Sequence, residues 1–361
     1  MIGSGDGQVA SAPAQPEPAP DCPSVPAVIF SVLVLLGSFA ALFQIDIPIL
    51  RFLRSHNLSA LQSFGDLGEK LGNGGTLITI SLLLLGAGFW LKRQAWMQIA
   101  LDSLLAHGMV AIVVNSLKHI IGRPRPRLTH SGGWHWWPSL ESGLDSFPSG
   151  HTSATVAVVT VLARALPRLR WVPFALATWV GASRIWRGSH FPGDVVGGVA
   201  LGFVVGSVCN EPLREWRQSG SRALVRIAPI VLLLTGLFWV LTHRVVDPVM
   251  DTVFLVVGLV LLGSGWLVRT GWGLLARRAA AGDRGTGSNA LILFGLGVAT
   301  GAPVVIGLTA LLCVAQWIAA TGVPACESAA GRSWRADGVY ALGLLAAVVA
   351  VQLLKGLVPL H

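Results

Sequence analysis

The sequence predicts an all-α integral membrane protein with a core of six transmembrane helices and about four further helices after it. Hydrophobic residues make up 53% of the 361 residues and charged residues only 12%, so the chain carries more apolar surface than a water-soluble core of this size buries. Apolar runs of roughly 20 residues, long enough to cross a bilayer, recur along the chain. The basic residues lie mainly in short loops between these runs.

The elements follow in order from these runs. Residues 1–26 are rich in Pro, Ala, Ser and Gly and contain no Lys or Arg, which predicts a disordered tail and not a cleaved signal peptide. The run at 290–319 is long for one helix, and Gly301 with Pro303 could kink or divide it. Ten spans are predicted, at 27–44, 75–91, 97–121, 150–166, 171–187, 193–210, 227–243, 249–268, 290–319 and 338–358.

The basic loops predict the orientation. With a cytoplasmic N-terminus, the inner side receives Lys92, Arg93, Arg164, Arg168, Arg170, Arg214, Arg217, Arg222, Arg226, Arg277, Arg278 and Arg284. This agrees with the positive-inside rule and predicts a multi-pass protein of the cell (inner, cytoplasmic) membrane. The loops that join spans three and four, and spans five and six, then face the periplasm or the exterior. The net charge of +9 therefore reflects topology, and no nucleic-acid partner is expected.

The cysteines indicate neither a disulfide nor a metal site. Cys209 and Cys313 fall within spans, Cys22 lies in the inner tail and Cys326 in an outer loop, so Cys326 has no predicted disulfide partner. No Cys or His pair has zinc-ligand spacing. We expect no metal and no other cofactor.

Three separated fragments carry the polar chemistry. Alone, each has an ordinary reading, such as a lysine that reaches the membrane interface or a turn before a capped helix. Together they supply three cations, two histidines, a carboxylate and a glycine at a helix start, which suits attack on a phosphoryl group. The fragments are Lys118 with Arg125 and Pro126, then Pro148, Ser149, Gly150 and His151, then Ser183 and Arg184 with His190 and Asp194.

The phosphate-binding residues follow from the charge of a phosphoryl group in transfer. Its equatorial oxygens share negative charge, and Lys118, Arg125 and Arg184 can supply the opposing cations. Ser149 and Gly150 precede the fourth span, where the free N–H groups of a helix start bind anions.

His190 is the candidate nucleophile. A neutral imidazole attacks phosphorus while its other nitrogen keeps its proton, and we expect that nitrogen to be hydrogen-bonded to Asp194, near a helix start at Pro192. His151 is expected to protonate the departing oxygen and later to deprotonate the attacking water. These two roles predict a bell-shaped pH profile.

The fragments match Lys-x6-Arg-Pro, Pro-Ser-Gly-His and Ser-Arg-x5-His-x3-Asp without a gap, and the chain thereby resembles the type 2 phosphatidic acid phosphatase (PAP2) superfamily. The resemblance covers about residues 27–212 and implies a PAP2-type six-helix catalytic core that needs no metal. We place a basic cytoplasmic linker at 213–226 and a membrane extension of unknown role at 227–361. The resemblance implies the same roles: phosphate binding by Lys118, Arg125, Arg184, Ser149 and Gly150, acid catalysis by His151, and attack by His190 held by Asp194.

Five neighbouring residues are candidate lipid contacts. Arg123 and Arg127 flank Arg125 and could bind a second phosphate or lie against lipid headgroups, with the second reading slightly favoured. Trp134, Trp136 and Trp137 are expected to anchor an outer loop at the interface, where tryptophan is enriched. Gating of a lipid tail is the alternative for the tryptophans.

The predicted function is hydrolysis of a lipid phosphate or diphosphate at the outer face through a phosphohistidine. Candidate substrates are a polyprenyl diphosphate such as undecaprenyl diphosphate, phosphatidic acid and phosphatidylglycerophosphate. A phosphotransferase that passes the phosphoryl group to an acceptor hydroxyl is the alternative, and a non-enzymatic transporter or structural protein is a third. The C-terminal spans carry no motif and are expected to be scaffold, with Gly258, Gly263 and Gly265 suited to close helix packing. Lipid entry, a dimer surface and a partner site stay open. The sequence leaves the oligomeric state undetermined.

Overall fold

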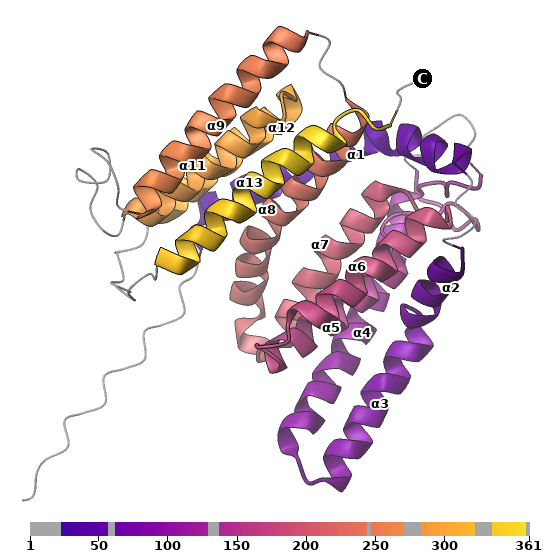
Figure 1. The fold of residues 1–361 in the computed structure, drawn as a ribbon. Helices are drawn as coiled ribbons and strands as arrows, with labels where there is room; N and C mark the ends of the chain where they lie inside the picture. Colours follow the sequence, from indigo (N-terminus) through magenta and orange to yellow (C-terminus); the bar gives the residue numbers. More distant parts are fainter. Residues whose placement is uncertain are drawn as a thin grey trace, which may run out of the picture.

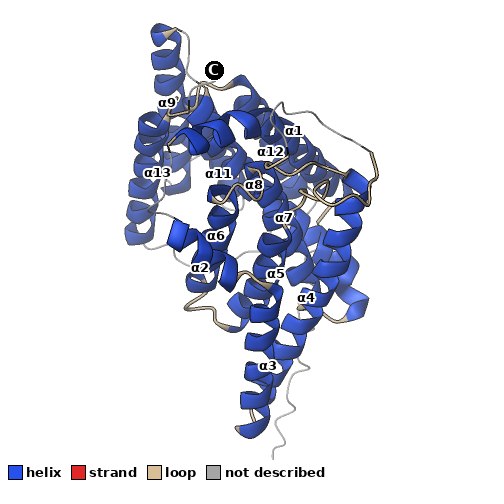
Figure 2. Ribbon diagram, turned by 90° about the vertical axis from the view of Figure 1, so that its right-hand side faces the viewer, coloured by secondary structure: helices blue, strands red, loops and turns tan. Residues whose placement is uncertain are grey.

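The computed structural model describes residues 23–56, 62–128, 137–243, 247–270, 283–321 and 334–358. Within these ranges every regular element is a helix (Figures 1 and 2), which confirms the predicted all-α class. Most of the predicted tail lies outside the described residues. So do Cys22, Trp134, Trp136, Arg277, Arg278 and Cys326.

Seven helices, α1 to α7, form the part of the protein that carries the three fragments. The first, α1 (Val25–Ser55), runs eleven residues past the predicted end of its span, and α2 (Gln62–Leu71) was not predicted. Helix α2 precedes α3 (Gly74–Trp90) with a bend of 52°. The others are α4 (Gln94–Ile121), α5 (Gly150–Ala165), α6 (Trp171–Trp186) and α7 (Pro192–Cys209).

Glycines along α7 let α5 pack closely against it. A Cβ added to Gly198, Gly202 or Gly206 would lie 2.9, 2.4 or 2.5 Å from a backbone carbonyl oxygen of α5 or of the residue before it. Small residues at every fourth position are the usual means by which membrane helices approach one another. Because Gly198 faces the start of α5 and Gly206 faces its middle, the two helices run parallel and begin at the same end of the bundle.

The span count is lower than predicted. Five described helices are long and apolar enough to cross a membrane, and six if the bent pair α2 and α3 counts as one. Helices α5 and α6 have 16 residues each, which is about 24 Å of helix and short of the roughly 30 Å hydrocarbon core. The predicted count of ten treated every apolar run as one full crossing.

The C-terminal region is helical as well. A short 3-10 turn at Leu213–Glu215 leads into α8 (Trp216–Thr242), so the predicted linker is largely the first part of a helix. The run at 290–319 is divided, since α11 (Asp283–Ala299) ends just before Gly301, which has φ +66°, and α12 (Pro303–Thr321) starts at the proline. The remaining helices are α9 (Pro248–Thr270) and α13 (Trp334–Leu354).

Helix α1 joins the two parts of the molecule. Its buried residues Leu42 and Ile45 share one apolar cluster with Ile227 and Val231 of α8 and with Val196 of α7. In Figure 1, α9, α11, α12 and α13 lie together on the other side of α8 from α3 and α4. The C-terminal extension, which begins within α8, is therefore packed against α1.

Two of the three glycines expected to support close packing in the extension do so. A Cβ on Gly258 or Gly265 would come within 3 Å of α11, whereas one on Gly263 would meet no atom within 4 Å. The prediction for Gly263 was wrong because that residue lies away from its neighbour helix.

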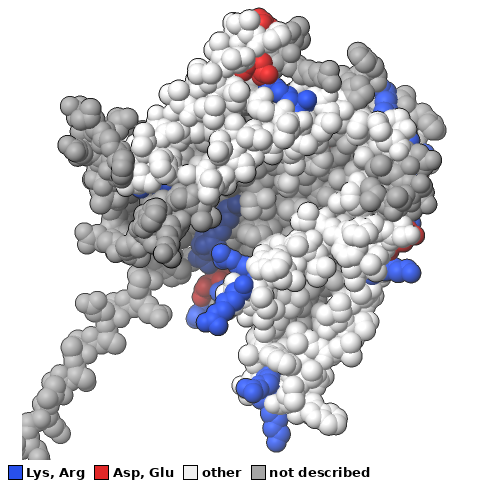
Figure 3. Space-filling model, viewed as in Figure 1, with Lys and Arg blue, Asp and Glu red and all other residues white. Residues whose placement is uncertain are grey.

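The basic loops and the three fragments lie at different ends of the core. The face seen in Figure 3 is largely uncharged, and most of its Lys and Arg side chains lie toward the lower ends of the helices. Lys92 and Arg93 connect α3 and α4, and Arg164 near the end of α5 pairs with Glu211 at 2.6 Å. The three fragments lie at the opposite ends of α4, α5 and α7. The basic loops and the fragments therefore occupy opposite ends of this all-α integral membrane protein, and the orientation itself stays a prediction.

Candidate active site

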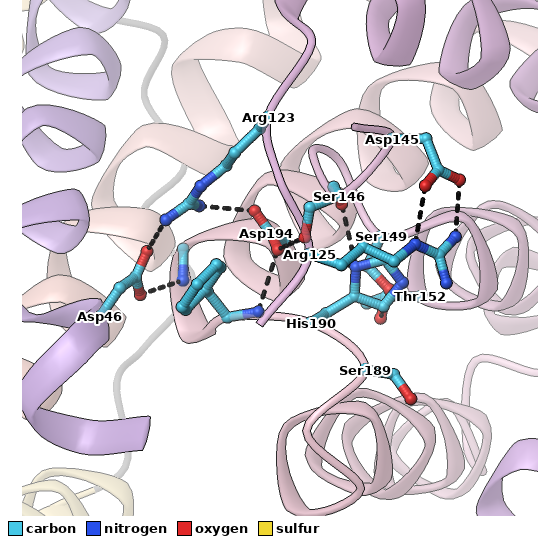
Figure 4. Close-up of polar contacts among 12 residues, drawn as sticks. Asp46, Arg123, Arg125, Asp145, Ser146, Ser149, Thr152, Ser189, His190 and Asp194 are labelled. Carbon is cyan, nitrogen blue, oxygen red and sulfur yellow. Dashed lines mark hydrogen bonds and ion pairs between the residues drawn. The ribbon is translucent and has the colours of Figure 1, made fainter. Parts of the chain in front are cut away.

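All three fragments meet at one end of the bundle. Backbone hydrogen bonds join the segments that carry them: Ser146 N donates to Arg123 O at 2.9 Å, and Ser149 N donates to Asp194 O at 3.0 Å. Within the third fragment, His190 N donates to Arg184 O at 3.2 Å. Figure 4 shows the resulting group of side chains between α1, α5 and α7.

Gly122 allows the chain to turn into this region. It ends α4 with φ +62°, and a Cβ at this position would lie 2.1 Å from the carbonyl oxygen of Trp137. Left-handed backbone and the close approach both favour glycine. The turn places Lys118 on the last turn of α4 and Arg123 directly after it.

His190 lies in the loop between α6 and α7, with 2% of its surface exposed. Its Nδ1 is 2.9 Å from the carbonyl oxygen of Ser146 and 3.6 Å from Asp194 Oδ2. The predicted partner Asp194 thus lies beside the ring, and the backbone carbonyl of Ser146 is a second and nearer acceptor. A carbonyl oxygen can only accept, so Nδ1 keeps the proton and Nε2 keeps its lone pair.

Burial also favours the neutral form of His190. Loss of hydration lowers the pKa of His190 below its ordinary value, and the opposite influence of Asp194 is smaller. Arg184 and Arg125 lower this pKa further. The side chain is thus neutral at neutral pH.

Asp194 is fully buried at the third residue of α7, which begins at Pro192 as predicted. Its Oδ2 accepts hydrogen bonds from Ser146 Oγ at 2.5 Å and Phe191 N at 2.9 Å, and its Oδ1 accepts one from Arg123 at 2.5 Å. Asp194 therefore lies beside His190 as a counter-charge, held by three donors.

Arg123 does not contact lipid, which corrects the favoured reading. It is 3% exposed, and its guanidinium joins Asp194 at 2.5 Å to Asp46 of α1 at 2.6 Å. The rings of Phe43 and Phe191 cover it, with their centroids 4.5 and 4.4 Å from the guanidinium carbon. Burial alone would lower the pKa of Arg123, but the two carboxylates raise it above its usual range.

Sequence reasoning missed Asp46. The signal was present, because a lone carboxylate inside an apolar run is costly and usually functional. Its predicted span stopped at residue 44, whereas the helix continues to Ser55.

Lys118 and Arg125 share the carboxylate of Asp145, which sequence reasoning also missed. Arg125 binds it through two nitrogens at 2.7 and 2.6 Å, and Lys118 Nζ lies 3.6 Å away. Burial tends to raise the pKa of Asp145, but the two cations lower it below its ordinary value. Asp145 thus occupies the place where an anionic group of a ligand would meet both cations.

Arg184 lies at the end of α6 with 4% exposure, facing α2. Its Nη1 is 3.0 Å from Glu69 Oε1, yet in the described part of the chain neither Nε nor Nη1 has a hydrogen-bond partner of suitable geometry. Arg187 pairs with Glu69 at 2.7 Å and also with Asp66. Helix α2, which sequence reasoning did not find, therefore supplies two carboxylates to this cluster.

The second fragment forms the start of α5. The helix begins at Gly150 with Ser149 as its N-cap, and Ser149 Oγ accepts a hydrogen bond from Thr152 Oγ1 at 3.0 Å. A Cβ on Gly150 would lie 3.8 Å from Lys118 Nζ. His151 is half-buried in the first turn. The lysine and the N–H groups of this helix start therefore lie together.

Two of the remaining candidate lipid contacts, Arg127 and Trp137, are described by the structure and are exposed. Trp137 is 78% exposed, and Arg127 is exposed with one nitrogen 3.3 Å from Ser189 Oγ. Trp134 and Trp136 fall outside the described residues. Anchoring of this loop to the interface stays a prediction.

Comparison with known proteins identifies the family. A sequence model of the PAP2 superfamily matches residues 99–218, which contain all three fragments. The lipid A 1-phosphatase of Rhizobium etli is 32% identical over 163 residues, covering 41% of this chain and 69% of that protein. The chain belongs to the PAP2 superfamily.

Other PAP2 relatives have different substrates in their names. Phosphatidylglycerophosphatase B of Bacillus subtilis is 29% identical over 38% of this chain and 70% of its own length. The undecaprenyl-diphosphatase of the same organism is 29% identical over 27% of this chain and 50% of its own length. The chain is thus a multi-pass PAP2 phosphatase, a hydrolase, and the reading as a non-enzymatic membrane protein is set aside.

Proposed function

We propose that this PAP2 protein hydrolyses the phosphate or diphosphate monoester of a membrane lipid at the outer face, through a phosphohistidine on His190. The observation that carries the proposal is Arg184, a buried guanidinium with two N–H groups lacking hydrogen-bond partners in the described structure, near a buried histidine whose Nδ1 is hydrogen-bonded to Ser146 O. Buried donors without acceptors are costly, and phosphate oxygens would satisfy them.

The substrate phosphate would enter among Lys118, Arg125 and Arg184. The phosphate oxygens would bind these cations beside Asp145 and Glu69 or displace the two carboxylates. The N–H groups at the start of α5 would bind a further phosphate oxygen. Negative charge on the equatorial oxygens would then face three cations in a partly buried site, where charges interact more strongly than in water.

In the first step Nε2 of His190 attacks phosphorus, and the bond from phosphorus to the lipid oxygen breaks. His151 donates its proton to that oxygen. The proton on Nδ1 stays in its hydrogen bond to Ser146 O, and Asp194 stabilises the positive charge that develops on the ring.

In the second step water replaces the histidine. His151, now neutral, takes a proton from the water as its oxygen bonds to phosphorus and the P–N bond breaks. Phosphate leaves and His190 is regenerated with Nδ1 still protonated. These residues supply every proton and charge in both steps, so we propose a reaction that uses no metal.

The substrate and the side of the membrane are part of this proposal. Basic loops at the opposite end of the core support an outward-facing site. The relatives support a lipid phosphate in general, and undecaprenyl diphosphate, phosphatidic acid and phosphatidylglycerophosphate are all candidates. Arg123 no longer favours a diphosphate, because it is already bound to two carboxylates.

The test is phosphate release by the purified full-length protein with each candidate lipid in the presence of a chelator. We expect release from at least one lipid by wild type and by His56→Ala, a variant of an exposed histidine at the end of α1. His190→Ala should lose release by several orders of magnitude. Equal release by wild type and His190→Ala would refute the proposal, and label on an added alcohol in place of free phosphate would indicate phosphotransfer.

A further inference from the structure

A buried chain of charges runs from α1 to the start of α7. Asp46 and Asp194 have fully buried side chains, and the Arg123 side chain between them is 4% exposed. These three residues come from α1, from the loop after α4 and from α7. Arg123 stands at an unspecified position of the Lys-x6-Arg-Pro motif and Asp46 lies outside the three fragments, yet both are connected to the carboxylate beside His190 (Figure 4).

We propose that Asp46 and Arg123 are positioning residues for the reaction at His190, where they fix Asp194 and set how much of its negative charge the histidine experiences. This inference rests on the proposed function, since it concerns the charge on the phosphorylated histidine.

The contacts fix the orientation of Asp194. Arg123 offers one nitrogen to Asp194 Oδ1 at 2.5 Å and another to Asp46 Oδ2 at 2.6 Å. The planar guanidinium presents two separate nitrogens in a fixed fork to the two carboxylates, whereas a lysine offers a single nitrogen. With Oδ1 held by Arg123, the other oxygen of Asp194 is the one that lies 3.6 Å from His190 Nδ1.

Asp46 also fixes the helix that carries Asp194. Its Oδ1 accepts a hydrogen bond from Gly193 N at 2.8 Å, and a Cβ on Gly193 would come within 2.7 Å of Asp46 Oδ2. The rings of Phe43 and Phe191 cover the guanidinium. The N-terminal helix α1 thus determines where the first turn of α7 lies.

The charges give Asp46 a second effect. Two carboxylates share one guanidinium, so Arg123 neutralises Asp194 only in part. The charged groups that face His190 are Asp194 from α7, Arg184 from α6, Arg125 from the loop after α4 and His151 from α5. Asp194 is the carboxylate in this set. If Asp46 lost its charge, Arg123 would neutralise Asp194 more fully, and the cation on His190 would lose stabilisation.

The experiment compares Asp46→Asn with Leu42→Ala in the full-length protein, using the lipid with the highest release. Leu42 lies one turn earlier on α1 and is fully buried, so its truncation weakens packing without altering charge. Initial rates are measured over a range of lipid concentrations and pH, together with thermal unfolding. The readouts are kcat, KM and the acidic limb of the pH profile.

For Asp46→Asn we expect kcat to fall about tenfold with KM little changed, since the lost effect is electrostatic stabilisation of the reaction. The acidic limb should move to lower pH by on the order of one unit, as expected for one charge within about 10 Å at an effective dielectric constant of about 20. Leu42→Ala should lower thermal stability and leave the acidic limb in place.

A wild-type kcat and acidic limb in Asp46→Asn would overturn the inference, as would an equal shift of the limb in Leu42→Ala. If Asp46→Asn does not fold, Arg123→Lys serves instead. It keeps the charge but has one nitrogen in place of the two that contact the carboxylates, so it loses the fixed geometry, and a wild-type kcat would again overturn the inference. If His190→Ala still released phosphate, the proposed function would be refuted. Failure of the inference and failure of the proposed function therefore give different results.

Discussion

Asp145 competes with the substrate phosphate for Lys118 and Arg125, and its removal should strengthen phosphate binding. The carboxylate binds Arg125 through two charge-assisted hydrogen bonds and lies 3.6 Å from Lys118. The ion pair is partly exposed, with about a third of the Arg125 side chain and a quarter of the Asp145 side chain accessible. Asp145→Asn keeps the shape of the side chain and removes the competing charge.

The magnitude follows from the geometry. A hydrogen-bonded pair of charges contributes about 1.5–3 kcal/mol when it is shielded, and an exposed one about 1 kcal/mol or less. A value of about 1.4 kcal/mol suits this partly exposed pair and corresponds to a tenfold lower inhibition constant for inorganic phosphate. The effect should diminish as salt increases, because the pair is reached by solvent.

The assay is inhibition of lipid hydrolysis by inorganic phosphate, compared between wild type, Asp145→Asn and Glu141→Gln. Glu141 is an exposed carboxylate of the same loop, so its variant measures the general effect of one lost charge. Weaker phosphate inhibition in Asp145→Asn than in wild type would refute the reasoning. It would mean that Asp145 holds Arg125 in place for the ligand and does not compete with it.

Three further predictions follow from other parts of the molecule. Burial lowers the pKa of His190, so its neutral form persists below its ordinary pKa of about 6.5. The value of kcat/KM should therefore decline with falling pH only below about 6.5. A decline that is already complete at neutral pH would contradict this. Arg123→Ala should lower the free energy of unfolding by about 3–5 kcal/mol by leaving two buried carboxylates unpaired, measured by thermal unfolding, whereas Arg127→Ala should change it little. Gly202→Leu should separate α5 from α7 and cost at least about 1–3 kcal/mol, while Gly263→Leu, with open space around it, should be tolerated.

The fold class and the grouping of the three fragments could be predicted from the sequence. Composition dictates a bilayer, and the spacing of apolar runs places the ends of α4, α5, α6 and α7 on a common side. Pro192 marked the start of α7, and the division of the run at 290–319 was visible in Gly301 and Pro303.

What the sequence could not give depended on tertiary contacts. Asp46 and Glu69 reach the site only because α1 and α2 pack against it, and neither has a motif around it. The hydrogen bond from His190 to the carbonyl of Ser146, beside the predicted partner Asp194, depends on the path of the loop at Ser146. Fewer helices than the ten predicted spans pass the length and hydropathy test within the described residues, because α5 and α6 have only 16 residues each.

The central claim is that His190 carries the phosphoryl group, and trapping the intermediate tests it most directly. The full-length protein would be mixed with a lipid carrying a radiolabelled phosphate, quenched within a turnover under alkaline conditions that preserve phosphohistidine, and digested to locate the label. We predict label on the peptide that contains His190, removed by acid and missing from His190→Ala. Phosphate release with label on another residue, or with no labelled protein at any quench time, would contradict the account.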